Sequence, residues 1–168
     1  MNSLAARIDS DYVMEELRLC HVRSLADEIE MDGISTGATL SIEGALQDYI
    51  PSLVDSPGYH WVILYGGDSE ICGVISVEKG KFDTCDHNLA IWVKPSHRRK
   101  GLCVDAICKA AEILKEDGVR LVEMKVRKDN LPTLAAADGV CRRLSVVVAD
   151  NNDEYKQWTI QIFGEHDG

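Results

Sequence analysis

Between a predicted strand and a predicted helix, the chain reads Val93-Lys94-Pro95-Ser96-His97-Arg98-Arg99-Lys100-Gly101-Leu102-Cys103. Apolar residues alternate at positions 89, 91 and 93, which predicts a half-buried strand that ends before Pro95. Apolar residues at positions 104, 107, 111 and 114 have helical spacing, so a helix is expected to follow. The segment therefore predicts a strand joined to a helix through a basic turn that contains a glycine.

The N-terminus of this helix is suited to binding an anion. Its unpaired N–H groups and the positive end of the helix dipole favour negative charge. Gly101 lets a ligand approach the backbone, and Arg98, Arg99 and Lys100 add charged donors. A nucleotide P-loop and a Rossmann turn both require glycine patterns that are missing here. The turn thus indicates a phosphate site of another kind, with a solvated basic loop as the alternative.

The run from Arg98 to Cys103 resembles the Arg/Gln-x-x-Gly-x-Gly/Ala motif with which the GNAT superfamily of N-acetyltransferases binds acyl-CoA. Cys103 departs from the motif, which has Gly or Ala at this position. The resemblance implies that the turn holds the CoA pyrophosphate and that the pantetheine arm pairs with the preceding strand. The cofactor residues that it implies are Ile91, Trp92, Val93, Arg98, Arg99, Lys100, Gly101, Leu102, Cys103, Val104, Asn130 and Thr133.

The other predicted elements follow the order of the family. Upstream, we expect a strand at 13–19 and helices at 21–30 and 41–54, and this region is similar to the RimJ/RimL-like branch. The remaining elements are a hairpin of strands 61–66 and 71–78, a polar loop at 79–86, a strand at 120–126, a helix ending near 140–146, and a closing hairpin of 145–149 and 154–163.

The resemblance implies one α/β domain over residues 1–168. Its expected architecture is a mixed, mostly antiparallel twisted sheet of six to seven strands, flanked by about four helices. The fourth and fifth strands are expected to splay apart. Two features depart from the family: Ser145-Val146 replaces Gly-Phe, and Ala136 and Ala137 occupy the region of the tyrosine that many members use as general acid.

Three residues are candidates for the chemistry of acetyl transfer. His87 is the first choice as general base because it shares its strand face with Leu89 and because imidazole titrates near neutral pH. Glu123, two residues before Lys125, is the second candidate base. Thr133 lies where RimJ/RimL-like enzymes place a serine near the CoA sulfur. The alternatives are a surface histidine, an exposed carboxylate paired with a basic neighbour, and a residue that only begins a helix.

Composition limits the partners of the protein. The net charge of −10 argues against nucleic acid and is compatible with a cationic amine, although acidic surfaces also keep proteins soluble. No apolar run is long enough to cross a membrane, and the N-terminus lacks a secretory signal pattern, so we expect a cytoplasmic protein. Six scattered cysteines without a C-x-x-C pair predict neither a disulfide framework nor a metal site.

The sequence therefore predicts an acetyl-CoA-dependent N-acetyltransferase that acts on a primary amine of a small molecule or peptide. Two alternatives stay open. One is a GNAT-like protein that binds acyl-CoA without turnover, and the other is an acyltransferase for a longer acyl chain. In many relatives the closing hairpin pairs with a second subunit, so a homodimer is also considered.

Overall fold

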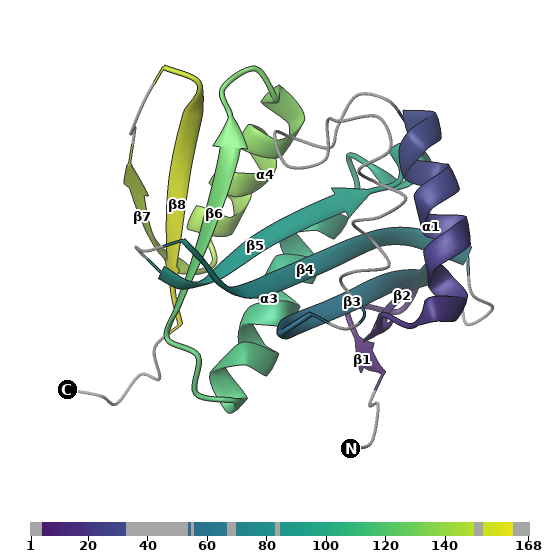
Figure 1. Cartoon of the computed structure of the whole chain (residues 1–168). Helices are drawn as coiled ribbons and strands as arrows, with labels where there is room; N and C mark the ends of the chain where they lie inside the picture. The colour runs from purple at the N-terminus through teal and green to yellow at the C-terminus, as the bar shows by residue number, and fades with distance from the viewer. Residues whose placement is uncertain are drawn as a thin grey trace.

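A computed structural model describes residues 5–32, 54, 56–66, 70–82, 85–149 and 153–162. In this part of the chain, eight strands form one sheet in the order β1-β2-β3-β4-β5-β6-β8-β7 (Figure 1). The strands are β1 (Ala6–Arg7), β2 (Tyr12–Glu16), β3 (Gly58–Tyr65), β4 (Glu70–Phe82), β5 (Cys85–Val93), β6 (Leu121–Arg127), β7 (Ser145–Ala149) and β8 (Tyr155–Gln161).

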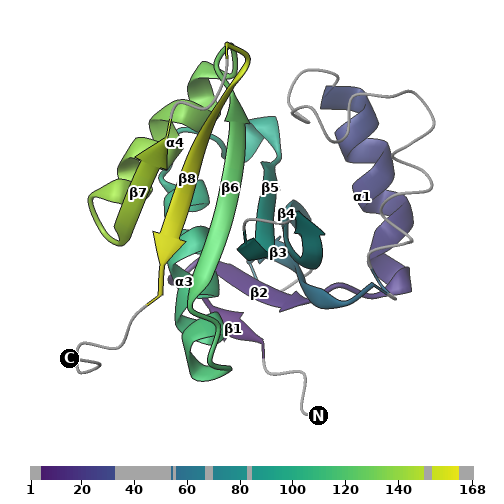
Figure 2. The ribbon, with the colours of Figure 1, turned by 60° about the vertical axis from the view of Figure 1, so that its left-hand side comes forward.

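Helices lie on both faces of the sheet. Helix α1 (Leu19–Asp32) covers one face, and helices α3 (Leu102–Glu116) and α4 (Leu131–Cys141) cover the other (Figure 2). A 3₁₀ turn, η1 (Pro95–His97), follows β5. Helix α4 packs closely on α3. A Cβ added at Gly139 would lie only 2.8 Å from Cγ2 of Val104, so the contact leaves no room for a side chain at Gly139. None of the described helices combines the length and the apolar character that a membrane crossing requires.

The larger hydrophobic core lies between the sheet and the pair α3 and α4. Ile107 and Leu114 of α3 pack there with Ile75, Val122 and Trp158 of the sheet, and each of these side chains is at most 1% exposed. A smaller apolar cluster lies on the α1 face, where Leu25 contributes from the helix. Its other buried members are Leu17, Val62, Leu64, Val74 and Trp92. In the part of the chain that the structure describes, the α1 face thus has the smaller apolar cluster.

Strands β5 and β6 form the only parallel pair among the described strands, and they are joined at a single register pair, Asn88 with Glu123. The chain between them forms α3, as a parallel connection requires. Beyond this pair the strands diverge toward their carboxyl ends (Figure 1). The predicted splay between the fourth and fifth strands of the family order is confirmed, and the fold is the α/β fold that the sequence predicts.

Several predicted boundaries are wrong. The polar loop expected at 79–86 is largely strand, because β4 continues to Phe82 and Phe82 pairs with Cys85 of β5. Cross-strand pairing here overrides the low strand propensity of the polar residues. The first predicted strand ends earlier, at Glu16, and the two-residue strand β1 raises the count to eight strands. The helix predicted at 41–54 lies outside the described residues, apart from Val54.

Candidate functional site

The basic turn after β5 has the backbone shape of an anion site. Gly101 is the N-cap of α3 in the left-handed region, with φ of 77°, and no side chain caps the helix. Arg99 also has a positive φ, of 62°. The Nε of Arg98 donates to the carbonyl of Val93 at 2.8 Å, which ties the turn back to β5. The first N–H groups of α3 have no intrahelical partner by construction, so they can bind an anion.

An acidic residue also lies in the first turn of α3. The carboxylate of Asp105 forms an ion pair with Arg143, which follows α4. The ion pair balances the negative charge of Asp105, which would otherwise weaken anion binding at this helix end. Sequence reasoning did not identify this pair, because its two residues meet only when α4 packs on α3.

A buried histidine in the turn is hydrogen-bonded to side chains of strands β2 and β4. His97 in η1 is 6% exposed, and its Nδ1 lies 2.8 Å from the hydroxyl of Tyr12. Its Nε2 lies 3.2 Å from Oε1 of Glu70, which also contacts Nζ of Lys94 at 3.4 Å. His97 belongs to the predicted turn, but its partners on β2 and β4 could not be inferred from spacing.

Glu70, Cys72 and His97 bring three metal-ligating atoms within 4.8 Å of one another. Each of the three side chains already has a hydrogen-bond partner in the cluster. Nε2 of His97 contacts Oε1 of Glu70, and Sγ of Cys72 donates to the backbone carbonyl of Glu70. Burial raises the pKa of Cys72 to about 12, so its thiol is protonated at neutral pH. The group is therefore satisfied as it stands in the structure.

The strand that leads to the turn contributes Ile91, Trp92 and Val93. Val93 faces the α3 side, where Ile91 also packs, and Trp92 is buried in the cluster on the α1 side. These residues lie past the pair of Asn88 and Glu123, where β5 and β6 diverge. A diverging edge of this kind is where a ligand can add itself as a strand.

The remaining cofactor candidates lie at the starts of α3 and α4. Leu102 is buried, and Cys103 and Val104 pack partly against the core. Burial raises the pKa of Cys103 to about 12, so the lowering that a helix N-terminus would cause does not prevail. Asn130 caps α4, since its Oδ1 accepts a hydrogen bond from the N–H of Thr133 at 3.3 Å. Thr133 is half-buried in the first turn of α4.

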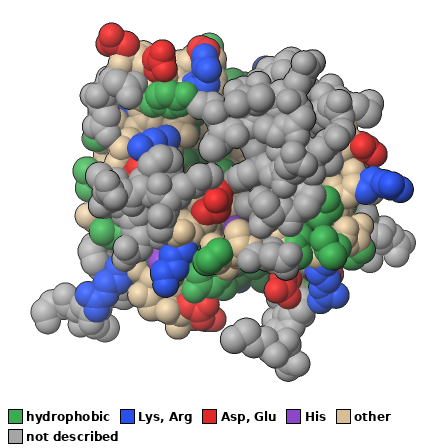
Figure 3. All heavy atoms as spheres, viewed as in Figure 1, with side chains coloured by type: hydrophobic (Ala, Val, Ile, Leu, Met, Phe, Trp, Pro, Cys, Tyr) green, Lys and Arg blue, Asp and Glu red, His purple; other side chains and the backbone are tan. Residues whose placement is uncertain are grey.

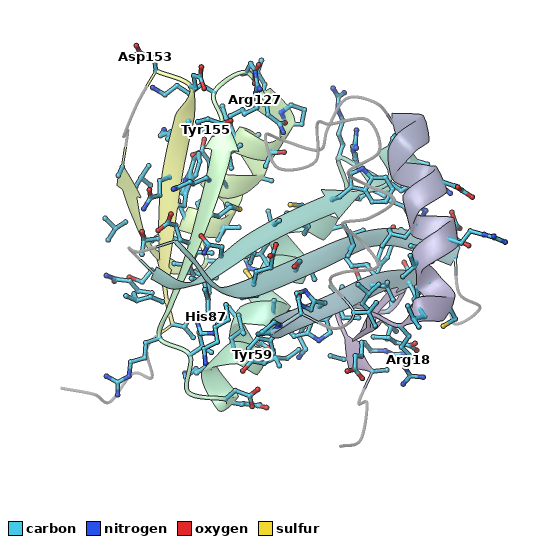
Figure 4. The ribbon with its side chains drawn as sticks, viewed as in Figure 1. Arg18, Tyr59, His87, Arg127, Asp153 and Tyr155 are labelled. Carbon is cyan, nitrogen blue, oxygen red and sulfur yellow. The ribbon has the colours of Figure 1, made fainter. Side chains whose placement is uncertain are left out.

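The two candidate bases lie on opposite faces of the sheet. Glu123 is 1% exposed, and its Oε1 lies 3.4 Å from Nζ of Lys125. Glu123 is the register partner of Asn88, and both side chains lie on the face of the sheet opposite to the larger core. His87, the neighbour of Asn88 in the chain, faces the other side and lies beside Tyr59, with ring centroids 6.3 Å apart (Figure 4).

Sequence reasoning missed a group of polar residues on the Glu123 face. His60 of β3 is buried between the hydroxyls of Ser56 and Ser76, each at 2.8 Å from a ring nitrogen. The amide nitrogen of Asn88 is also buried, and it has no hydrogen-bond partner in the described part of the chain. The alternation on β3 and β4 would have placed His60 and Ser76 on one face, but only the register shows that they meet.

The sequence pattern of the acetyltransferase (GNAT) family matches residues 36–139. The chain belongs to this family. The match includes the basic turn and the strands β5 and β6. A search of curated proteins finds no sequence match to the chain.

Solved structures of GNAT acetyltransferases share the fold over nearly the whole chain. RimL, the ribosomal L7/L12 α-N-protein acetyltransferase solved with coenzyme A, has a TM-score of 0.71 at 13% identity and covers 94% of this chain and 96% of its own. The spermidine N-acetyltransferase of Vibrio cholerae, with CoA and spermine, has 0.70 at 14% identity, covering 91% and 97%. The microcin C7 self-immunity acetyltransferase MccE, with acetyl-CoA and AMP, has 0.67 at 18% identity, covering 95% and 96%.

Proposed function

We propose that this GNAT protein is an acetyl-CoA-dependent N-acetyltransferase that acts on a primary amine of a small molecule or peptide. The uncapped N-terminus of α3, with Gly101 in the left-handed conformation, is the observation that carries the proposal. This helix end lies at the carboxyl end of β5, where β5 and β6 diverge. In that arrangement, the turn binds the CoA pyrophosphate and β5 pairs with the pantetheine arm.

The length of β5 sets where the thioester would lie. Val93 lies five positions after Asn88, so an extended ligand that follows the strand travels about 17 Å between them. A pantetheine arm that begins at the turn would therefore bring its sulfur toward the pair of Asn88 and Glu123. Backbone N–H groups on the open edge of β5 would polarise the thioester carbonyl.

Glu123 is the base candidate that this placement favours. Its carboxylate lies at the junction of β5 and β6, on the face that also carries Asn88. A buried carboxylate attracts an ammonium group and can accept its first proton, which produces the neutral amine that attacks the thioester. His87 lies on the opposite face, where its ring packs beside that of Tyr59, so its role there would be structural.

A cationic acceptor is part of the proposal. The net charge of −10 favours a cation, and Figure 3 shows acidic and basic side chains interspersed, without a broad basic area among the described residues on that face. Spermidine N-acetyltransferase and RimL supply two acceptor classes with which to begin, a polyamine and a protein N-terminus.

Calorimetric titration with acetyl-CoA, CoA and ATP tests the cofactor, and thiol release with spermidine and an N-terminal peptide tests transfer. Micromolar binding of acetyl-CoA but not ATP, followed by amine-dependent thiol release, is expected. Binding without thiol release from any amine would favour the non-catalytic alternative, which Ala136 and Ala137 in place of the usual tyrosine keep open. Absence of acetyl-CoA binding would reject the proposed cofactor site.

The proposal includes a homodimer and a cytoplasmic location. Strand β7 is an edge of the sheet, and its residues Val147 and Val148 are exposed. Exposed apolar residues on an edge strand favour pairing with a second chain. Sedimentation of the wild-type protein and of a Val148→Lys variant would test this, since a dimer through β7 should dissociate in the variant.

A further inference from the structure

Three polar residues form a chain of hydrogen bonds on the α1 face. Ser56 precedes β3, His60 lies in β3 and Ser76 in β4. The Oγ of Ser56 is 2.8 Å from Nε2 of His60, and the Oγ of Ser76 is 2.8 Å from Nδ1 of the same ring. His60 is 9% and Ser76 4% exposed, whereas Ser56 is half-buried. The chain thus runs from a partly exposed hydroxyl to one buried in the middle of the sheet.

The buried end of this chain lies near the proposed thioester position. Ser76 is the register partner of Ala90 on β5, and Ala90 lies two residues beyond Asn88 toward the open end of the splay. Because the side chain of Ala90 is a methyl group, only this small group lies between Ser76 and a ligand bound along the edge of β5. The next row of the same face contains Glu78, Asn88 and Glu123.

The surroundings of His60 favour its neutral ring. Burial lowers the pKa of His60, and the contact with Ser56 and the charge of Glu78 oppose this effect only in part. A neutral imidazole donates from one nitrogen and accepts at the other. A serine hydroxyl can donate to a ring nitrogen or accept from it, so the two serines fit either tautomer of His60. A proton can therefore pass from Ser76 to the ring and return to Ser76.

Amide formation from an ammonium ion requires more than one proton transfer. The nitrogen loses two protons, the sulfur of CoA gains one, and one proton leaves to solvent. Glu123 accounts for the first proton that leaves the amine. For the general acid at sulfur, the sequence offers Thr133 at the start of α4, and the tyrosine that usually serves is missing from its place near Ala136 and Ala137. Ser76 is an alternative to Thr133 in this role.

We propose that Ser76, backed by His60, carries the second proton from the attacking nitrogen to the leaving sulfur. This inference rests on the proposed acetyl transfer. After the C–N bond forms, the nitrogen gives a proton to Oγ of Ser76, whose own proton passes to Nδ1 of His60. When the C–S bond breaks, its electron pair stays on sulfur, and Ser76 then protonates the thiolate and recovers a proton from His60. Ser76 is the catalytic residue, and His60 is a positioning residue that acts through it.

The first test compares the two serines. With acetyl-CoA and spermidine or the N-terminal peptide, Ser76→Ala should lower kcat about 100-fold and leave acetyl-CoA affinity unchanged. Ser56→Ala removes a hydrogen bond from the same ring at its distant nitrogen and should lower kcat less than about fivefold. Ser76→Thr keeps the hydroxyl and should retain most of the wild-type rate that Ser76→Ala loses. Equal losses in the two alanine variants, or a Ser76→Ala rate within threefold of wild type, would overturn the relay.

The second test follows His60 itself. His60→Gln should lower kcat at unchanged acetyl-CoA affinity, and the rate of this variant should fall less steeply in acid than that of wild type, because the contribution from protonation of the ring is gone. Nitrogen-15 spectra of the imidazole should show a neutral ring at pH 7, and a charged ring would overturn the relay without any acceptor. Lack of acetyl-CoA binding would instead reject the proposed function, and binding without thiol release would reject catalysis and relay together.

Discussion

The two faces of the sheet differ in what they bury. The α3 side is packed with apolar side chains from the sheet, α3 and α4, among them Ile107, Val122 and Trp158. Among the described residues, the α1 side has a smaller apolar cluster than the α3 side, and it also buries His60, Ser76 and Glu123. Burying polar groups costs stability unless they are bonded, and His60 and Ser76 bond to each other. The larger core thus holds most of the apolar burial described, and the α1 face carries most of the buried polar groups for which we propose a chemical role.

The largest expected effect tests the apolar face. Ile107→Ala removes a side chain that is 1% exposed and should lower the free energy of unfolding by about 2–5 kcal/mol. Ile113→Ala, on the same helix but half-buried, should cost clearly less. Denaturant unfolding measures both variants. Equal losses would show that the burial of a side chain on α3 does not set its contribution to stability.

The second prediction separates ligand binding from stability at the two ends of α3. Gly101→Asp should weaken acetyl-CoA binding by more than about 100-fold, or about 2.7 kcal/mol, because it adds a carboxylate at the phosphate turn. Gly118→Asp is the matched control, since Gly118 also has a positive φ, of 79°, at the other end of the helix. Both variants should fold, and calorimetry should show normal binding only in the control. Unchanged binding in Gly101→Asp would show that the phosphate site lies elsewhere.

The third prediction compares the two candidate bases on opposite faces. Glu123→Gln keeps the shape of the side chain and removes its charge, so kcat/KM for the amine should fall about 100-fold. His87→Gln should change it less than about threefold, because His87 lies beside Tyr59 on the apolar side. Steady-state kinetics with one amine measures both. The reverse order would assign the proton transfer to His87 and to the α3 face.

The smallest expected effect concerns acid. The pKa of His60 is lowered by burial, so the unfolded chain binds more protons below its ordinary value near 6.5. Stability from the neutral ring is therefore complete above about pH 6.5 and is lost as the pH falls, by at most about 1.4 kcal/mol per pH unit. His21, whose pKa burial also lowers, acts in the same direction. Melting temperatures at pH 7.5 and 5.5 should differ less in His60→Gln than in wild type, and an equal difference would contradict this.

Local patterns predicted much of the fold. Alternation and helical spacing placed β5, α3 and both hairpins. The anion site at the basic turn with Gly101 stays a prediction. The extension of β4 and β5 was missed because pairing across the hairpin, rather than residue propensity, decides where those strands end.

The candidate site was less predictable, because its members come from separate strands. Glu123 could be proposed from its place on one strand, but its neighbour Asn88 is known only from the register. His60 and Ser76 lie on strands that the sequence predicted correctly, yet nothing in the spacing indicated that a ring nitrogen and a hydroxyl would meet. Pairs of this kind depend on sheet order, which a single sequence specifies only indirectly.

The single pair of Asn88 and Glu123 also has a consequence for how the chain folds. Strands β1 to β5 form antiparallel pairs of neighbours, and β6 to β8 form a second antiparallel group. The hairpins of β3 with β4, β4 with β5 and β7 with β8 join strands that follow one another in the chain, so we expect them to form early. The pairs β2–β3, β5–β6 and β6–β8 join segments far apart in sequence and are expected to form later. Among these later pairs, β5–β6 is held by one register pair, so the strand junction beside the proposed ligand site is also the one with the least backbone pairing to complete.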